Sequence, residues 1–305
     1  MRTHARRTIA GATIVAFALI AAACGSGDDG GTIEGPTITI GSANFSENAL
    51  VAEIYAQALE SEGYQVERKL NIGSREIYAP ALEAGELDLI PEYIGTMLTY
   101  LGGTPSPDSA ETHAALQAAW ESKGIEVLDF APAQDKNGFV VTRATAEALG
   151  LAKVSDLSAH NGTLVLGGPP ECPEREFCLQ GLESVYGLSF AEFRPLDVGG
   201  PITVAALEGN EIQVGLMFTS DGTIVAKDFV LLEDDKGLQP AENLAPAVRS
   251  EIIAAYGDKF AETLKKVSSK LTTAELTAMN KLVGIDGQDP EQVATDWLKA
   301  IGVTG

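Results

Sequence analysis

Histidine and cysteine are scarce in this chain of 305 residues, which contains three of each. His113 and His160 stand among polar residues, and neither adjoins a cysteine in the sequence. The chain also has no G-x-S-x-G and no H-E-x-x-H motif, the patterns of a nucleophile elbow and a zinc protease. A G-x-G-x-x-G pattern at residues 25–30 has no expected strand before it and no helix after it, so it does not indicate a dinucleotide site. We therefore expect no catalytic residues, no metal and no cofactor, and an exported enzyme is the less favoured class.

Basic residues are also few: 21 Lys and Arg stand against 43 Asp and Glu, for a formal net charge of −22. A surface this acidic repels nucleic acid and anionic lipid headgroups, because both bind to basic patches. We expect no nucleic-acid partner. The charge is compatible with a cationic or zwitterionic small ligand.

Long apolar runs are absent after the N-terminal region. The run at residues 14–20 follows several arginines, precedes three alanines ending at Ala23, and is too short for the ~20 residues that span a bilayer. This is the pattern of an export signal, here residues 1–23. The next residue, Cys24, completes a segment that resembles the lipobox of bacterial lipoproteins. That resemblance implies lipidation of Cys24 as the only membrane anchor and a location outside the cytoplasm. Residues 25–35 are mostly Gly, Ser, Asp and Thr, which predicts a flexible tether over residues 24–35.

Two cysteines remain, Cys172 and Cys178. An exported chain is oxidised outside the cytoplasm, which favours a disulfide across this short loop. The alternative is a pair of metal ligands. Five intervening residues do not make a zinc knuckle, and neither histidine adjoins the pair.

Strand and helix patterns alternate along the chain and predict the α/β class. A helix is expected from Ser46 to the glycine at position 63, and after Pro240 only helices are expected. The expected strands are 37–40, 66–70, 87–90, 139–142, 164–166, 193–196, 212–217 and 229–232. The other expected helices include 75–84, 179–186, 250–256, 261–270, 273–282 and 290–300.

A sequence pattern that occurs twice in the chain predicts two lobes. Residues 81–89 align with residues 206–214, and the same offset places Tyr93 on Phe218, each just beyond a strand. Ligands of open α/β sheets bind beyond the carboxyl ends of the strands, so the two rings are expected to face one cleft; the alternative is that both are ordinary core residues. The expected lobes are residues 36–136 plus 238–305 and residues 137–237, with hinges near 135–138 and 234–237.

Several segments resemble the binding proteins of osmoprotectant ABC importers, which carry glycine betaine, carnitine, choline or proline betaine. They are residues 40–47 (IGSANFSE), 73–77 (GSREI), 88–96 (DLIPEYIGT), 186–222 and 271–298. The resemblance implies a two-lobed periplasmic-binding-protein fold of type II, with a mainly parallel sheet in each lobe and the C-terminal helices packed on the first. It implies a monomer that captures one small ligand between the lobes. Its partner would be a membrane permease with a cytoplasmic ATPase.

The family binds a quaternary ammonium in a cage of aromatic rings and its carboxylate with basic and hydroxyl groups. Carried over by position, Tyr93 matches a cage tyrosine, Phe218 a second aromatic wall and Thr96 the hydroxyl. Arg175 matches the basic clamp. The alternative for Arg175 is a surface ion pair with a neighbouring glutamate.

This sequence departs from the family at several cage positions. Ala43 stands where relatives carry lysine, Gly138 stands at one tyrosine position, and Val204 or Thr203 stands at another. Two aromatic walls and one basic contact are therefore expected to be missing. The alternatives are a polar or aromatic ligand other than a betaine, or an extracellular sensor. The remaining polar lining is expected to comprise Ser42, Asn44, Asn137 and Thr219.

Overall fold

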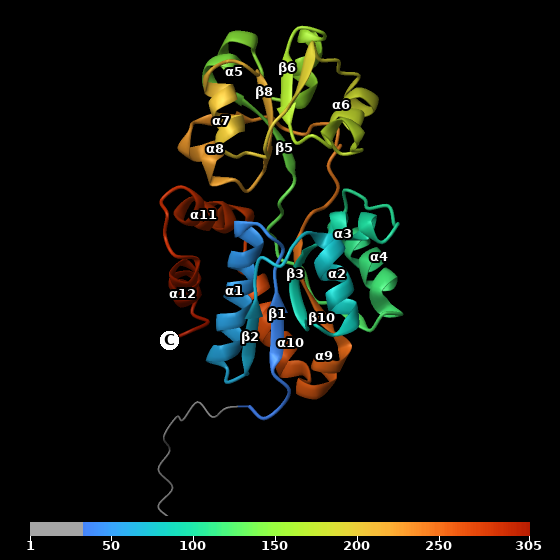
Figure 1. Ribbon diagram of the computed structural model, residues 1–305, viewed down its shortest axis with the longest axis vertical. Coiled ribbons are helices and arrows are strands. Elements are labelled where there is room, and N and C mark those ends of the chain that lie inside the picture. The colour runs from blue at the N-terminus through green and yellow to red at the C-terminus, as the bar shows by residue number, and fades with distance from the viewer. Residues whose placement is uncertain (1–32) are drawn as a thin grey trace, which may run out of the picture. The chain divides into compact units, whose positions relative to one another are not determined.

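The structure is a computed structural model that describes residues 33–305 (Figure 1). The export signal, Cys24 and most of the expected tether lie outside the described residues. Within them the protein is α/β with two five-stranded sheets, which confirms the expected fold class. No helix in this part of the chain is both long and apolar enough to cross a membrane.

The first sheet has the strand order β2-β1-β3-β10-β4. Its strands are β1 (Ile38–Gly41), β2 (Val66–Lys69), β3 (Leu89–Tyr93), β4 (Ile125–Val127) and β10 (Leu244–Arg249). Strand β1 pairs in parallel with β2 and β3, whereas β10 runs antiparallel between β3 and β4.

The second sheet has the order β7-β6-β8-β5-β9. Its strands are β5 (Asn137–Thr142), β6 (Val165–Gly168), β7 (Glu192–Pro195), β8 (Val214–Phe218) and β9 (Phe229–Leu231). Strand β6 is parallel to β7 and β8, and β5 is antiparallel to β8 and β9. Both sheets are therefore mixed, which corrects the expectation of mainly parallel sheets.

Helices cover both faces of each sheet. On the first sheet, one core joins α1, α10, α11 and α12, and another joins α2, α3 and α4. On the second sheet, α5 and α6 share one core, while α7 and α8 contribute to the other. The helices are α1 (Ser46–Ser61), α2 (Arg75–Ala84), α3 (Ile94–Tyr100), α4 (Ser109–Glu121), α5 (Arg143–Leu149), α6 (Leu179–Tyr186), α7 (Pro201–Glu208), α8 (Gly222–Ala226), α9 (Ser250–Tyr256), α10 (Asp258–Ser268), α11 (Thr273–Gly284) and α12 (Pro290–Ala300).

The sequence pattern missed two strands, β4 and β10. Strand β10 was missed because only helices were expected after Pro240. Its sequence, LAPAVR, contains two alanines and Pro246, and Val248 is its one β-branched residue, so the strand signal is weak. Pro246 lies directly opposite Pro91 of β3. Neither residue has an amide hydrogen to donate, and each carbonyl is used elsewhere: Leu128 N donates to Pro246 O at 2.9 Å, and Asn48 Nδ2 donates to Pro91 O at 2.9 Å.

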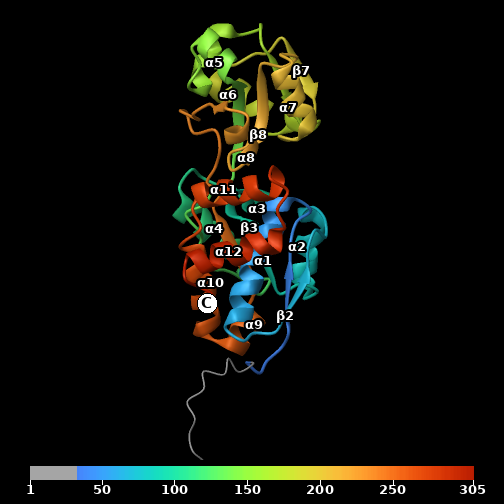
Figure 2. The ribbon, with the colours of Figure 1, turned by 90° about the vertical axis from the view of Figure 1, so that its left-hand side faces the viewer.

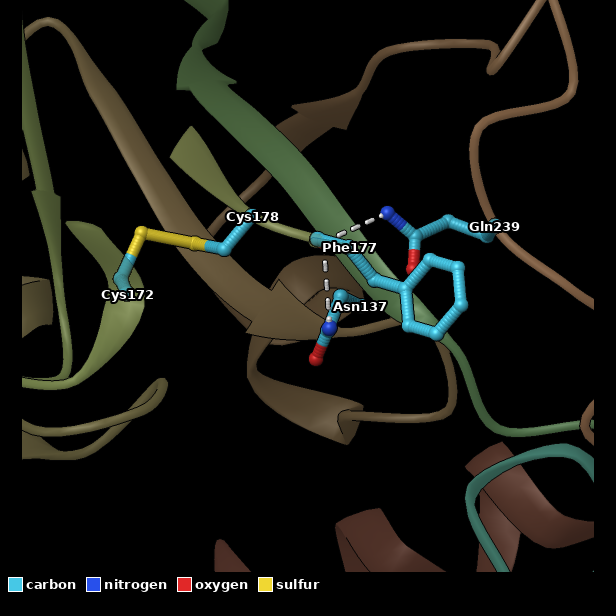
Figure 3. The surroundings of a disulfide bond; sticks show 5 residues. All are labelled: Asn137, Cys172, Phe177, Cys178 and Gln239. Carbon is cyan, nitrogen blue, oxygen red and sulfur yellow. Dashed lines mark hydrogen bonds between the residues drawn. A yellow bond between two sulfur atoms is a disulfide. The ribbon is translucent and has the colours of Figure 1, made fainter. Parts of the chain in front are cut away.

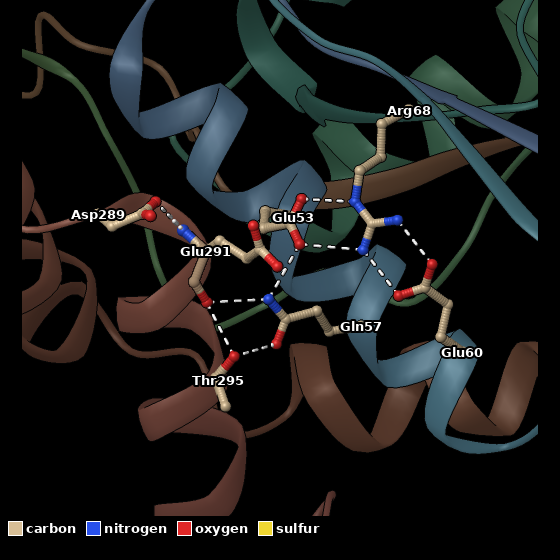
Figure 4. Close-up of polar contacts among 7 residues, drawn as sticks. All are labelled: Glu53, Gln57, Glu60, Arg68, Asp289, Glu291 and Thr295. Atoms are coloured by element: carbon tan, nitrogen blue, oxygen red, sulfur yellow. Dashed lines mark hydrogen bonds and ion pairs between the residues drawn. The ribbon is translucent and has the colours of Figure 1, made fainter.

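The C-terminal helices return to the first sheet, as expected, and α12 packs against α1 in both views (Figure 1, Figure 2). A polar network ties these helices together (Figure 4). Gln57 of α1 donates to the carbonyl oxygen of Glu291 and accepts from the hydroxyl of Thr295. Arg68 of β2 donates to Glu53, which is also in α1, at 2.7 Å. These contacts fix the positions of β2, α1 and α12 relative to one another.

The chain crosses between the two sheets twice, after β4 and after β9. The two crossing segments pair at one antiparallel bridge between Gln134 and Asn243. The described residues fall within one compact unit. The lobe boundaries after residues 136 and 237 and the two hinges therefore stay predictions.

Candidate ligand-binding site

A cavity of about 540 Å³ is lined by residues of both sheets. Tyr93 at the carboxyl end of β3 and Phe218 at the carboxyl end of β8 both line it. Asn137 joins them because β5 is antiparallel to β8 and begins directly opposite Phe218. Tyr93 and Phe218, which the repeated sequence pattern identified, thus border one cavity.

A third ring, Phe45, connects these two. Its centroid lies 5.9 Å from that of Tyr93 and 6.4 Å from that of Phe218, which are distances of aromatic contact. Phe45 directly precedes α1 and lies in the IGSANFSE segment. Phe45 was not among the predicted site residues, although the segment that contains it was recognised in the sequence as similar to the family.

The loop closed by Cys172 and Cys178 supplies another part of the lining (Figure 3). The two sulfur atoms are bonded at 1.94 Å, so these residues form a disulfide in the structure and not a metal site. Phe177 inside this loop was missed from the sequence. Its carbonyl oxygen accepts from Nδ2 of Asn137 at 3.3 Å and from Nε2 of Gln239 at 2.9 Å, which fixes the loop against the second sheet.

Arg175, in the same loop, lines the cavity and takes part in none of the ion pairs formed within residues 33–305. The alternative of a pair with a neighbouring glutamate is therefore not seen here. Its guanidinium is available for a ligand carboxylate. Asn44 also lines the cavity, from the segment that leads into α1.

The second guanidinium of the cavity, Arg75, is already neutralised. Its Nη2 lies 2.6 Å from Oε1 of Glu92, a side chain with no exposed surface. The same carboxylate accepts from the hydroxyl of Tyr78 and from the backbone N–H of Tyr93, each at 2.7 Å. Arg75 and Glu92 thus hold in place the end of β3, where Tyr93 lies.

Thr96 lines the cavity, but its hydroxyl is engaged. It donates to Oε1 of Glu242 at 2.5 Å, and its backbone N–H donates to Oε2 at 3.1 Å. Burial raises the pKa of the Glu242 carboxyl to about 7, against the hydrogen bonds from Thr96 that lower it. A ligand in the cavity would therefore contact Thr96 hydrogen-bonded to Glu242, and not a free Thr96 hydroxyl.

The raised pKa of Glu242 predicts a pH-dependent stability. Between the ordinary pKa of 4.5 and about 7, the folded protein holds a proton on Glu242 that the unfolded chain releases. The contribution of Glu242 to stability is therefore most favourable below pH 4.5 and declines toward pH 7. Relative to Glu242→Gln, whose amide can donate to the Thr96 hydroxyl and accept from its N–H, the wild type is expected to lose about 1 kcal/mol per pH unit. Urea unfolding of both ligand-free proteins at pH 5, 6 and 7 measures this difference. Parallel pH profiles would contradict the assignment.

Two predicted lining residues lie elsewhere. Ser42 is fully buried, and its hydroxyl donates to the carbonyl of Ala43 and accepts from the N–H of Asn71. Thr219 accepts from the N–H of Lys136 and borders a separate cavity of about 190 Å³. Both follow or precede true lining residues by one position, and neighbouring residues of an extended chain point to opposite sides.

The same alternation changes the meaning of Gly138. A Cβ at this position would lie 2.6 Å from Cδ1 of Leu231, so a side chain there would point at β9 and not into the main cavity. Thr203 is buried and donates to the carbonyl of Asp197, and neither it nor Val204 lines the cavity. These positions therefore do not face the main cavity, and Phe45 and Phe177 line it beside the two predicted rings.

Carboxyl groups outnumber guanidinium groups around the cavity. Five acidic side chains line it against Arg75 and Arg175, and they are Glu76, Asp135, Glu171, Glu176 and Glu242. Burial, together with the nearby Glu47 carboxyl, raises the pKa of Asp135 well above its ordinary range. A raised pKa favours the neutral carboxyl, as it does for Glu242, so the acidic border is formed by Glu76, Glu171 and Glu176. A cavity with five aromatic rings, an acidic border and one unpaired guanidinium suits a cation or a zwitterion.

Comparison with known proteins gives a consistent result. Residues 36–300 match the family described as the substrate binding domain of ABC-type glycine betaine transport system. A glycine-betaine-binding protein of Pseudomonas aeruginosa is 31% identical over 88% of this chain and 89% of its own, and glycine betaine-binding protein YehZ of Escherichia coli is 28% identical over 88% and 91%. A solved structure titled as a glycine betaine/carnitine/choline ABC transporter is 26% identical, with a TM-score of 0.79 over 87% of this chain and 99% of that one.

Proposed function

Because the chain belongs to the family of substrate-binding domains of ABC-type glycine betaine transport systems, we propose that it captures a betaine or a related quaternary ammonium compound for import. The family consists of transport proteins and not enzymes, and its members bind small ligands outside the cytoplasm for a membrane permease. The observation that best supports this proposal is the cavity between the two sheets, with rings from both and the unpaired Arg175.

In this proposal the ring faces hold the ammonium and Arg175 holds the carboxylate. The ammonium charge is spread over methyl groups that donate no strong hydrogen bonds, so ring faces suit it better than carboxylates do. A guanidinium engages a carboxylate through two parallel hydrogen bonds. Phe45 and Tyr93 come from the first sheet region, and Phe177 and Phe218 from the second. A ligand between them would favour closure by bending at the two crossing segments.

The proposal includes the anchoring and the partners expected from the sequence. Lipidated Cys24 would tether a monomeric binding protein to the outer side of the cell membrane, beside its permease and the cytoplasmic ATPase. A betaine-like ligand is favoured over other polar or aromatic metabolites, because an acidic border and several ring faces together select a positive charge.

Ligand-dependent stabilisation tests this function. Glycine betaine, choline and carnitine are added to the purified protein, and at least one is expected to raise the unfolding temperature by adding about 2.7 kcal/mol at 100 times its Kd. Phe45→Ala is expected to remove most of this shift, since it deletes the ring between Tyr93 and Phe218. The control Val225→Ala changes a side chain that is 69% exposed and outside the cavity. No shift with any of the three compounds, and a shift with an aromatic metabolite instead, would replace the proposed ligand class.

A further inference from the structure

A buried carboxylate lies directly behind the aromatic lining. Glu47 is in the first turn of α1, two residues after Phe45, and is only 5% exposed. Its Oε1 accepts from the hydroxyl of Tyr93 at 2.5 Å. The ring of Tyr93 therefore borders the cavity, while its hydroxyl is held from behind by a residue that does not line the cavity.

The other oxygen of Glu47 contacts the second sheet region. Oε2 accepts from the hydroxyl of Ser220 at 2.5 Å and from the side-chain amide of Asn280 in α11. Asn280 also donates to the carbonyl of Ser220 at 3.0 Å, and the N–H of Ser220 donates to Oδ1 of Asp135 at 3.1 Å. The hydroxyl, the N–H and the carbonyl of Ser220 therefore all form hydrogen bonds. The approach is close because Gly222 meets the backbone of α11, where an added Cβ would lie 2.6 Å from Cα of Lys281.

The polar contacts repeat the arrangement of the rings. Phe45 and Glu47 are two residues apart, as are Phe218 and Ser220, and each pair places a ring on the cavity and a hydrogen-bonding group behind it. A buried carboxylate adds little net stability compared with an apolar side chain, because removing the charge from water is costly. With three donors directed at it, Glu47 instead fixes the relative positions of those donors.

We propose that Glu47 is a positioning residue that couples the Tyr93 ring to the second sheet region through Ser220. This inference rests on the proposed ligand-binding function of the cavity. Displacement of Ser220 would then alter the hydrogen bonding of Tyr93, and loss of the Tyr93 hydroxyl would weaken the hold on Ser220. Ligand affinity is thereby linked to the contact between the two halves of the protein.

A double-mutant cycle with Tyr93→Phe and Ser220→Ala tests the coupling, with glycine betaine and choline as probes in calorimetry. Each single variant is expected to weaken binding about 5–10-fold, and the double variant no more than the weaker-binding single variant, because both remove the same linkage. Tyr55→Phe and Ser268→Ala are the matched controls: their hydroxyls also bond to each other, at 3.0 Å, in the core and away from the cavity. Affinity unchanged in both single variants, or additive losses in the double variant, would overturn the coupling.

A second measurement needs no ligand and so separates this inference from the proposed function. The ring carbon that carries the hydroxyl of Tyr93 is followed by NMR after ¹³C labelling of tyrosine, with Tyr93→Phe assigning the signal. Ser220→Ala is expected to shift that signal, whereas Ser268→Ala leaves it in place. If neither probe binds the wild type, the proposed ligand class fails, and this arm alone decides the coupling. A signal that does not move in Ser220→Ala would overturn it.

Discussion

Replacing Arg75 with methionine is expected to lower the free energy of unfolding by about 3–5 kcal/mol, the cost of leaving one partner of a buried ion pair uncompensated. Glu92 has no exposed side-chain surface, and Arg75 is its one cationic neighbour among the ion pairs of residues 33–305. The hydrogen bonds from Tyr78 and from the N–H of Tyr93 would remain, but neither carries a positive charge. Urea unfolding of the ligand-free protein measures the loss.

Arg143→Met is the matched control for this prediction. Arg143 pairs with Asp228 at 2.7 Å, yet the two side chains are 52% and 71% exposed. Exposed pairs contribute about 0–1 kcal/mol, so this variant is expected to stay close to the wild type. Equal losses in both variants would contradict the argument, because burial is the property that distinguishes the two pairs.

Arg175→Ala is expected to weaken the binding of glycine betaine by about 2–4 kcal/mol, as for the loss of a central, desolvated contact. The unpaired guanidinium is the proposed partner of the ligand carboxylate. Choline carries the same trimethylammonium group and no carboxylate, so its affinity is expected to change little. Calorimetric titration of both compounds gives the ratio of the two effects.

Tyr93→Ala separates the two halves of the proposed ligand contact. Because it removes a ring face and not a charge, it is expected to weaken glycine betaine and choline alike, by about 2–4 kcal/mol. An Arg175→Ala variant that lost both ligands equally would point to a collapsed loop between Cys172 and Cys178. Unchanged affinity in both variants would refute the proposed site.

The sequence predicted the α/β class because most of the strands are short apolar runs and most of the helices carry apolar stripes. Helices α2, α6, α9 and α12 have the bounds that were expected. Strand β10 was missed because alanine and proline give no strand signal, and its place is set by burial between β3 and β4. Local propensity is overridden there by the tertiary environment.

The sequence predicted those site residues whose place follows from the end of a strand. It misplaced those whose role depends on the direction in which the side chain points. Tyr93 ends a strand of the first sheet and Phe218 ends a strand of the second, so the carboxyl-end rule found both. Ser42 and Gly138 were misplaced because a shift of one residue along an extended chain turns a side chain to the opposite face. Phe177 lies in a loop whose disulfide was expected from the sequence. Its contacts with Asn137 and Gln239 join residues far apart in the chain, and the sequence pattern does not indicate them.

Strand β10 also has a consequence for the order of synthesis. Strands β3 and β4 do not pair with each other and both require β10, which the ribosome makes only after the whole second sheet. Until then β3 has a bare edge that is able to pair with other chains. The nascent protein therefore cannot complete its first sheet until residues 244–249 have been synthesised.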